Sequence, residues 1–142
     1  MNVVLDTNII ISAFLSSEGA PAEVFELLIT GKIKNSTTQE IIQEVEDVIK
    51  RPYILKRSSI QKSLDFLKLF QNISEIVQPK KRHTVVKEDP DDDKFIDCAK
   101  ESGSKMIITG DAHLLHLKEF EGIYILTPRE CIQVLKTVKS HF

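Results

Sequence analysis

One stretch decides the fold of this chain: Val3-Val4-Leu5-Asp6-Thr7-Asn8. Its three apolar residues, two of them β-branched, predict a short strand that is buried on both faces. The strand stops abruptly on a carboxylate, a hydroxyl and a carboxamide. Because open α/β sheets bind ligands beyond the carboxyl ends of their strands, we expect Asp6 at the bottom of a site. The alternative interpretation is that Asp6 only caps a helix beginning near Ile9.

A second stretch has the same design: Met106-Ile107-Ile108-Thr109-Gly110-Asp111. If the two strands are parallel neighbours, the carboxylates of Asp6 and Asp111 come close together. Like charges at short range repel and raise each other's pKa unless a cation lies between them. The pair therefore favours a hard divalent metal over simple helix capping.

Composition describes an ordinary globular protein. The 142 residues are 42% hydrophobic and 28% charged, with a formal net charge of -2. This length predicts a single domain over residues 1–142. The overall charge does not indicate nucleic-acid binding, so such binding would depend on a local patch or on metals.

The two cysteines, Cys98 and Cys131, have no metal-binding spacing and are expected to be reduced core residues. There is no transmembrane run and no basic region before the first apolar stretch, so we expect no membrane association. A cytoplasmic location follows from both observations.

Helical patterns alternate with short apolar strands along the chain, which predicts an α/β fold with a mostly parallel sheet. The strands are expected at 3–5, 32–35, 75–77, 106–108 and 123–126. A helix from Thr37 to about Lys50 opens with a capping box formed by Thr37 and Glu40. The next helix, over 58–74, should turn inward Ile60, Leu64, Leu67 and either Phe70 or Leu69.

Two further groups of acids lie where helices begin or pass the sheet. Glu44 and Glu46 flank the apolar stripe of the 37–50 helix, and helical periodicity does not choose between them. The run Asp89-Pro90-Asp91-Asp92-Asp93 precedes another helix. Capping is the simplest interpretation, yet four acids in five residues exceed what one helix end uses.

These acids at the ends of elements form a set without convincing His or Cys ligands. It comprises Asp6, one glutamate of the 37–50 helix, one or more of Asp91 to Asp93, and Asp111. Such a set suits Mg²⁺ or Mn²⁺. Metal-assisted attack of water on a phosphodiester is the natural reaction of such a site.

In this order and spacing the motifs resemble the PIN domain, a nuclease family that includes many toxins of prokaryotic toxin–antitoxin pairs. The resemblance spans nearly the whole chain and rests on four segments. They are Val-Val-Leu-Asp6-Thr7-Asn8, Thr-Gln-Glu-Ile-Ile-Gln-Glu44-Val, Asp-Asp93-Lys-Phe-Ile-Asp-Cys-Ala and Ile-Thr109-Gly-Asp111-Ala-His-Leu-Leu. The ending Phe120-Glu-Gly-Ile-Tyr-Ile-Leu-Thr-Pro-Arg-Glu130 is similar to the toxin branch.

The resemblance implies a three-layer α/β/α fold with about five strands. It also implies metal ligands at Asp6, Glu44, Asp93 and Asp111, and polar positions that shape the site at Asn8 and Thr109. Asp92 and Asp93 stay alternatives for the main third acid, because a helical wheel turns Asp92 toward the apolar side. One departure is His113, where many relatives carry another Asp.

The implied activity is cleavage of single-stranded RNA with Mg²⁺ or Mn²⁺, with an antitoxin protein and a second copy of the chain as candidate partners. Basic residues expected to hold RNA are Lys80, Lys81 and Arg82, or Lys32 and Lys34. A metal-dependent phosphatase is disfavoured, because Asn8 stands where that class needs a second Asp. The remaining alternative is a catalytically silent scaffold of the same fold.

Overall fold

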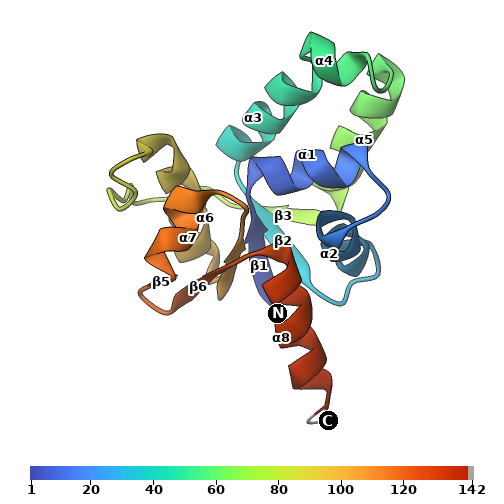
Figure 1. Ribbon diagram of the computed structural model, residues 1–142. Helices are drawn as coiled ribbons and strands as arrows, with labels where there is room; N and C mark the ends of the chain where they lie inside the picture. The colour runs from blue at the N-terminus through green and yellow to red at the C-terminus, as the bar shows by residue number, and fades with distance from the viewer. Residues whose placement is uncertain (141–142) are drawn as a thin grey trace.

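A computed structural model describes residues 1–140, so the last two residues of the predicted domain lie outside the described part. Its centre is a six-stranded sheet in the order β3-β2-β1-β4-β6-β5 (Figure 1). The strands are β1 (Asn2–Leu5), β2 (Lys34–Thr37), β3 (Ser74–Ile76), β4 (Met106–Ile108), β5 (Glu119–Phe120) and β6 (Ile123–Leu126). All neighbours are parallel except the edge pair of β5 and β6. The predicted mostly parallel α/β sheet is confirmed, with β5 as one strand more than expected.

Strand β1 occupies the middle of the sheet because it offers no polar surface to water. Val3 and Val4 are fully buried, and Leu5 is 1% exposed. Its neighbour β2 is polar, and the expected strand at 32–35 is displaced to Lys34–Thr37. Asn35 explains how a polar strand is buried there: its Oδ1 accepts a hydrogen bond from the Leu5 N–H at 3.0 Å, and its amide donates to Ser74. A pattern of apolar residues alone does not reveal such pairing.

Helices cover both faces of the sheet, which confirms the three-layer arrangement. Their bounds are α1 (Thr7–Leu15), α2 (Ala20–Ile29), α3 (Gln39–Ile49), α4 (Pro52–Leu55), α5 (Ile60–Asn72), α6 (Asp93–Ser102), α7 (Ala112–Leu117) and α8 (Pro128–Ser140). Helix α6 packs on β1, β2 and β4, and α7 packs on β6. Helices α1 and α2 lie on the other side of the sheet, where α8 packs against α2 (Figure 1). No helix within residues 1–140 is long and apolar enough to span a bilayer.

Two details of the helices differ from the sequence-based expectations. The cap of α3 is Thr38, whose hydroxyl accepts from the Ile41 N–H at 3.2 Å, whereas Thr37 closes β2. The prediction for Thr37 is wrong because the strand continues two residues farther than its apolar part. On α5, Leu67 and Phe70 are buried as expected.

The inward positions predicted for Ile60 and Leu64 are also wrong. Their side chains are 50% and 42% exposed, because the buried face of α5 consists of Ser63, Leu67 and Phe70.

Candidate active site

The candidate site lies between β1 and β4, where the order in which strands are added to the sheet changes side. From β1 the chain adds β2 and β3 on one side, then returns through α6 to add β4 on the other side. Leu5 and Ile108, the last residues of β1 and β4, stand side by side. Such a switch point leaves a crevice at the carboxyl ends of the two strands. Asp6 enters this crevice directly, because its own N–H still pairs with the Ile108 carbonyl at 3.0 Å.

Asp6 has two structural partners and is 3% exposed. Its Oδ1 accepts from the Ile9 N–H at 2.9 Å, which makes it the cap of α1. Its Oδ2 accepts from the Thr109 hydroxyl. Burial raises the pKa of Asp6 and the charge of Asp111 adds to that rise, although hydrogen bonds from Thr109 and from backbone amides oppose it. Capping and membership of an acidic site are therefore compatible roles for this residue.

Thr109 joins the two strand ends. It is fully buried, and its Oγ1 accepts from the Asp111 N–H at 2.9 Å while donating to Asp6. Asp111 in turn caps α7, since its Oδ1 accepts from the backbone N–H groups of His113 and Leu114 at 2.8 and 3.1 Å. The side chain of Asn8 is exposed beside Asp6.

Asp92 and Asp93, the adjacent acids at the start of α6, have different surroundings. Asp93 is 8% exposed, and its Oδ1 accepts from the backbone N–H groups of Val85 and Val86 at 3.0 and 2.9 Å. It thus ties the preceding loop to α6.

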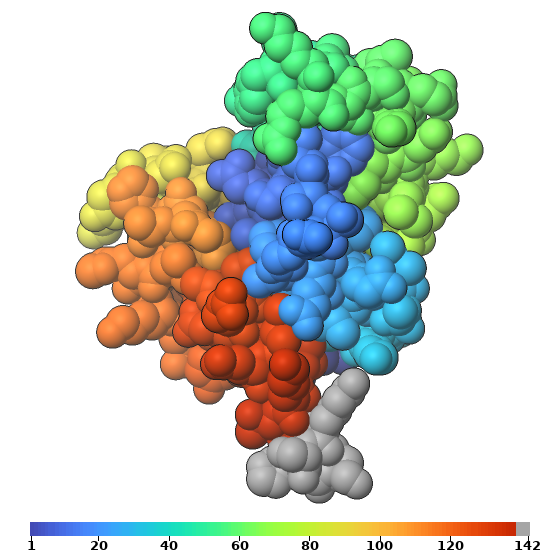
Figure 2. Space-filling view, turned by 45° about the vertical axis from the view of Figure 1, so that its right-hand side comes forward, coloured from blue at the N-terminus to red at the C-terminus, as the bar shows by residue number. Residues whose placement is uncertain are grey.

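Asp92 instead lies among the other acids of the crevice. Burial raises its pKa to about 8, and the nearby charges of Asp111, Asp89 and Asp6 contribute to the rise. Its Oδ2 is buried and finds no hydrogen-bond partner among the described residues. Asp6, Asp92 and Asp111 therefore lie near enough to one another for their charges to interact. Figure 2 shows the blue, yellow and orange segments that carry them meeting on one side of the surface.

Glu44 lies on α3 at the edge of this group. Its Oε1 accepts from the Thr7 hydroxyl, and its Oε2 lies 2.5 Å from the ammonium of Lys94. Lys94 also contacts Asp91 at 2.8 Å. Burial alone would lower the pKa of Lys94, but its hydrogen bonds and ion pairs with Asp91 and Glu44 outweigh burial and raise it. Glu46, the sequence alternative to Glu44, pairs with Lys50 on the surface.

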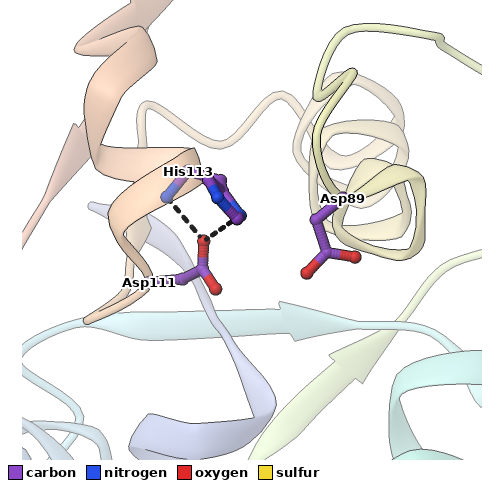
Figure 3. Close-up of side chains that lie close together, drawn as sticks. All are labelled: Asp89, Asp111 and His113. Atoms are coloured by element: carbon purple, nitrogen blue, oxygen red, sulfur yellow. Dashed lines mark hydrogen bonds and ion pairs between the residues drawn. The ribbon is translucent and has the colours of Figure 1, made fainter.

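Asp111 also belongs to a group with Asp89 and His113, whose side chains lie close together (Figure 3). Asp89, Asp111 and His113 each offer one atom, and these atoms lie within 4.8 Å of one another. The His113 Nδ1 stands 4.0 Å from Asp111 Oδ1. Sequence reasoning overlooked Asp89 and Lys94. Asp89 was interpreted as part of a helix cap, and Lys94 stood in the Asp-Asp93-Lys-Phe segment without an assigned role.

The basic residues are distributed unevenly around the crevice. Lys34 pairs with Asn2 at the start of β1, so it lies about four residues, roughly 13 Å, from the Asp6 end of the strand. We therefore exclude Lys32 and Lys34 from the site. Arg82 contacts Glu40 at 2.9 Å, one helical turn before Glu44. This contact places Arg82 against α3, the helix that carries Glu44.

This donor set fits a hard divalent cation. The converging groups are carboxylates, and Asp92 Oδ2 is a buried oxygen that nothing in the described chain satisfies. A buried acceptor without a partner is costly, and an ion or an ion-bound water would satisfy it.

Comparison with known proteins agrees with this geometry. The PIN-domain profile matches residues 2–113, a range that contains every acid described above. The chain belongs to the PIN-domain family. PIN domains are nucleases as a class, so the membership implies hydrolysis of nucleic-acid phosphodiesters.

Two relatives illustrate how far the PIN similarity extends. Uncharacterized protein MJ1680 of Methanocaldococcus jannaschii is 35% identical, with 94% of this chain and 90% of that protein covered. Among solved structures, a chain of VapBC2 from Rickettsia felis, bound to a DNA fragment from their promoter, superposes with a TM-score of 0.58. The match covers 88% of this chain and 97% of that chain at 15% identity, so it supports the fold alone.

Proposed function

We propose that this PIN domain is a metal-dependent endoribonuclease that hydrolyses single-stranded RNA, and that it acts as the toxin of a toxin–antitoxin pair. The observation that carries the proposal is the acidic crevice at the switch point, where the charges of Asp6 and Asp111 act on Asp92. One buried Asp92 oxygen there has no hydrogen-bond partner among the described residues. Three carboxylates in a half-buried crevice are electrostatically unfavourable without a cation.

In this proposal Asp6, Asp92 and Asp111 hold Mg²⁺ or Mn²⁺. When bound, such an ion lowers the pKa of water and offsets negative charge on a phosphoryl group. The PIN resemblance implied Asp93 as the third acid, with Asp92 as the alternative. We assign the role to Asp92, because its buried Oδ2 has no partner among the described residues, whereas Asp93 Oδ1 accepts from the backbone N–H groups of Val85 and Val86.

The remaining polar residues position these acids or meet the substrate. The Thr109 hydroxyl fixes the Asp6 carboxylate, and Glu44 forms the α3 side of the crevice. Asn8 is exposed two residues after Asp6, which supports a role in hydrogen-bonding a bound strand. Arg82 supplies positive charge for the RNA backbone.

The partners and location of the protein belong to the same proposal. The structurally similar VapBC2 chain comes from a complex of that name bound to promoter DNA, which supports an antitoxin as partner here. The exposed apolar residues of α5, Ile60, Leu64 and Leu69, offer a surface for a homodimer. We further propose that residues 1–142 form a single cytoplasmic domain. A continuous buried hydrophobic cluster within residues 1–140 and two free buried cysteines support this proposal.

The proposed activity is tested with a labelled single-stranded RNA, incubated with the full chain and Mn²⁺ or Mg²⁺. Single-stranded DNA and double-stranded RNA of the same sequence serve as matched substrates. We expect cleavage of the single-stranded RNA that EDTA abolishes. Asp6→Asn should reduce the rate at least 100-fold, because it keeps an acceptor for the α1 cap but removes a charge from the ion site.

The matched control is Asp65→Asn, which changes an acid exposed on α5. It should cleave like the parent. Intact RNA in every reaction, with ion binding still measurable by calorimetry, would contradict the nuclease proposal and favour the silent scaffold.

A further inference from the structure

We propose that Lys94 is a fixed cation of the acidic crevice: it holds Glu44 and takes the place of a second divalent ion, so that the protein binds one ion per chain. The inference rests on the proposed metal binding. It goes beyond that proposal by assigning a role to Lys94, which stands in the Asp-Asp93-Lys-Phe segment but was given no role by the resemblance, and by dividing the acids into two groups.

Lys94 is buried to an unusual degree for a lysine. It follows Asp93 in the first turn of α6, and its side chain is 5% exposed. Lysine is almost never fully buried unless it is paired, because removing an ammonium from water is costly. Two carboxylates offset this cost here, with Nζ 2.5 Å from Glu44 Oε2 and 2.8 Å from Asp91 Oδ2. The ammonium also lies 5.2 Å from the centre of the Phe95 ring.

Glu44 has both of its oxygens engaged by the protein itself. Oε1 accepts from the Thr7 hydroxyl and Oε2 from the Lys94 ammonium. Asp92 provides the contrast, because its buried Oδ2 has no such partner among the described residues. Asp6 also has both oxygens engaged, but its donors are a neutral hydroxyl and a backbone N–H. What distinguishes the Glu44 side of the crevice is the positive charge that the Lys94 ammonium supplies.

Charge divides the crevice in the same way. Glu44 and Asp91 share one ammonium. Around Asp6, Asp92 and Asp111 the nearby basic group is the imidazole of His113, whose Nδ1 lies 4.0 Å from Asp111 Oδ1. A divalent ion is attracted to these three acids and repelled from the position next to Lys94. Lys94 is thus a positioning residue: it orients Glu44 and limits the number of ions, without contacting the reacting atoms.

The number of bound ions tests this inference directly. We would titrate Mn²⁺ into the metal-free full chain and measure stoichiometry and affinity by calorimetry and by electron paramagnetic resonance. The variants are Lys94→Met, Lys94→Arg and, as matched control on the same helix, Lys100→Met. Lys100 is half-exposed at 36% and pairs with Glu121. We expect one ion in the parent, Lys94→Arg and Lys100→Met, and a second ion in Lys94→Met.

A second pair of variants covers the case in which Lys94→Met fails to fold. Glu44→Gln should change the Mn²⁺ dissociation constant less than about threefold, whereas Asp92→Asn should weaken binding at least tenfold. The double variant Lys94→Met with Glu44→Gln should fold and bind one ion, since neither charge is left unpaired by the loss of the other.

Two results would overturn the inference: two ions in the parent, or an unchanged count in Lys94→Met. Equal loss of affinity in Glu44→Gln and Asp92→Asn would do the same. These results are separable from the RNA assay. One ion without RNA cleavage contradicts the proposed function alone, and RNA cleavage with two ions contradicts only the role of Lys94.

Discussion

At the scale of single residues, neighbouring acids that look alike in sequence have opposite surroundings. Asp92 lies in the crevice with a raised pKa, and Asp93 binds the backbone of Val85 and Val86. The difference arises from the start of α6, where a 3₁₀ turn over Pro90–Asp92 precedes the helix. The turn directs successive side chains differently from the regular wheel that the sequence suggests.

The raised pKa of Asp92 predicts a specific dependence of stability on pH in the metal-free protein. Unfolded Asp92 loses its proton near pH 3.8, whereas the folded protein holds it until about pH 8. Folding therefore binds a proton between these values, and this contribution to stability, complete below about pH 4, is lost as the pH rises toward 8. The Asp92→Asn variant carries a neutral amide that does not titrate, so its stability does not fall with pH for this reason.

We expect Asp92→Asn to gain stability over the parent as the pH rises, by about 3 °C or more in melting temperature between pH 5 and pH 8. The measurement is thermal unfolding in EDTA at both pH values, with Asp65→Asn as the control. A constant difference between parent and Asp92→Asn would contradict the position of Asp92 among the acids.

At the scale of elements, two consecutive threonines form the junction of β2 and α3, and each belongs to a different element. Thr37 ends the strand fully buried, with a hydroxyl that finds no partner among the described residues. Thr38 caps the helix through its bond with the Ile41 N–H. The two side chains therefore make opposite contributions to stability.

We expect Thr38→Ala to destabilise the protein by about 1 kcal/mol, because a helix N–H loses its acceptor. Thr37→Val should stabilise it by about 1 kcal/mol, because a methyl group replaces a buried unsatisfied hydroxyl of similar shape. Urea unfolding of both variants measures the two signs. Destabilisation by Thr37→Val together with a neutral Thr38→Ala would show that Thr37 is the true cap.

At the scale of the whole molecule, the acidic crevice joins segments more than a hundred residues apart. Asp6 and Thr109 are hydrogen-bonded, and α6 brings Asp92 over both strands. An ion bound there, as proposed, would hold β1, β4 and α6 together and would stabilise the folded state by mass action.

We expect Mn²⁺ at a hundred times its dissociation constant to raise the stability of the parent by about 2.7 kcal/mol. In Asp6→Asn most of this increase should disappear. Glu46→Gln is the matched control, because Glu46 is the alternative glutamate on α3 and pairs with Lys50 away from the crevice. Thermal unfolding with and without Mn²⁺ gives the result, and an equal shift in all three proteins would place the ion elsewhere.

Much of this protein could be predicted from its sequence. Local sequence patterns predict the buried strand at Val3, the helices with their apolar stripes and the α/β class. These features depend on residues that are close together in the chain. The expectation that Asp6 and Asp111 meet also needed only two apolar strands of the same design. The PIN resemblance identified the family, which the match over residues 2–113 confirms.

Only the tertiary structure decided which side chains face one another. It decided that Asn35 allows a polar strand into the sheet, that Asp92 joins the crevice, and that Lys94 reaches Glu44 from a helix fifty residues away. These contacts depend on how α3 and α6 pack across the sheet. Sequence periodicity gives the face of a single helix, but it does not give the angle and register at which two helices meet.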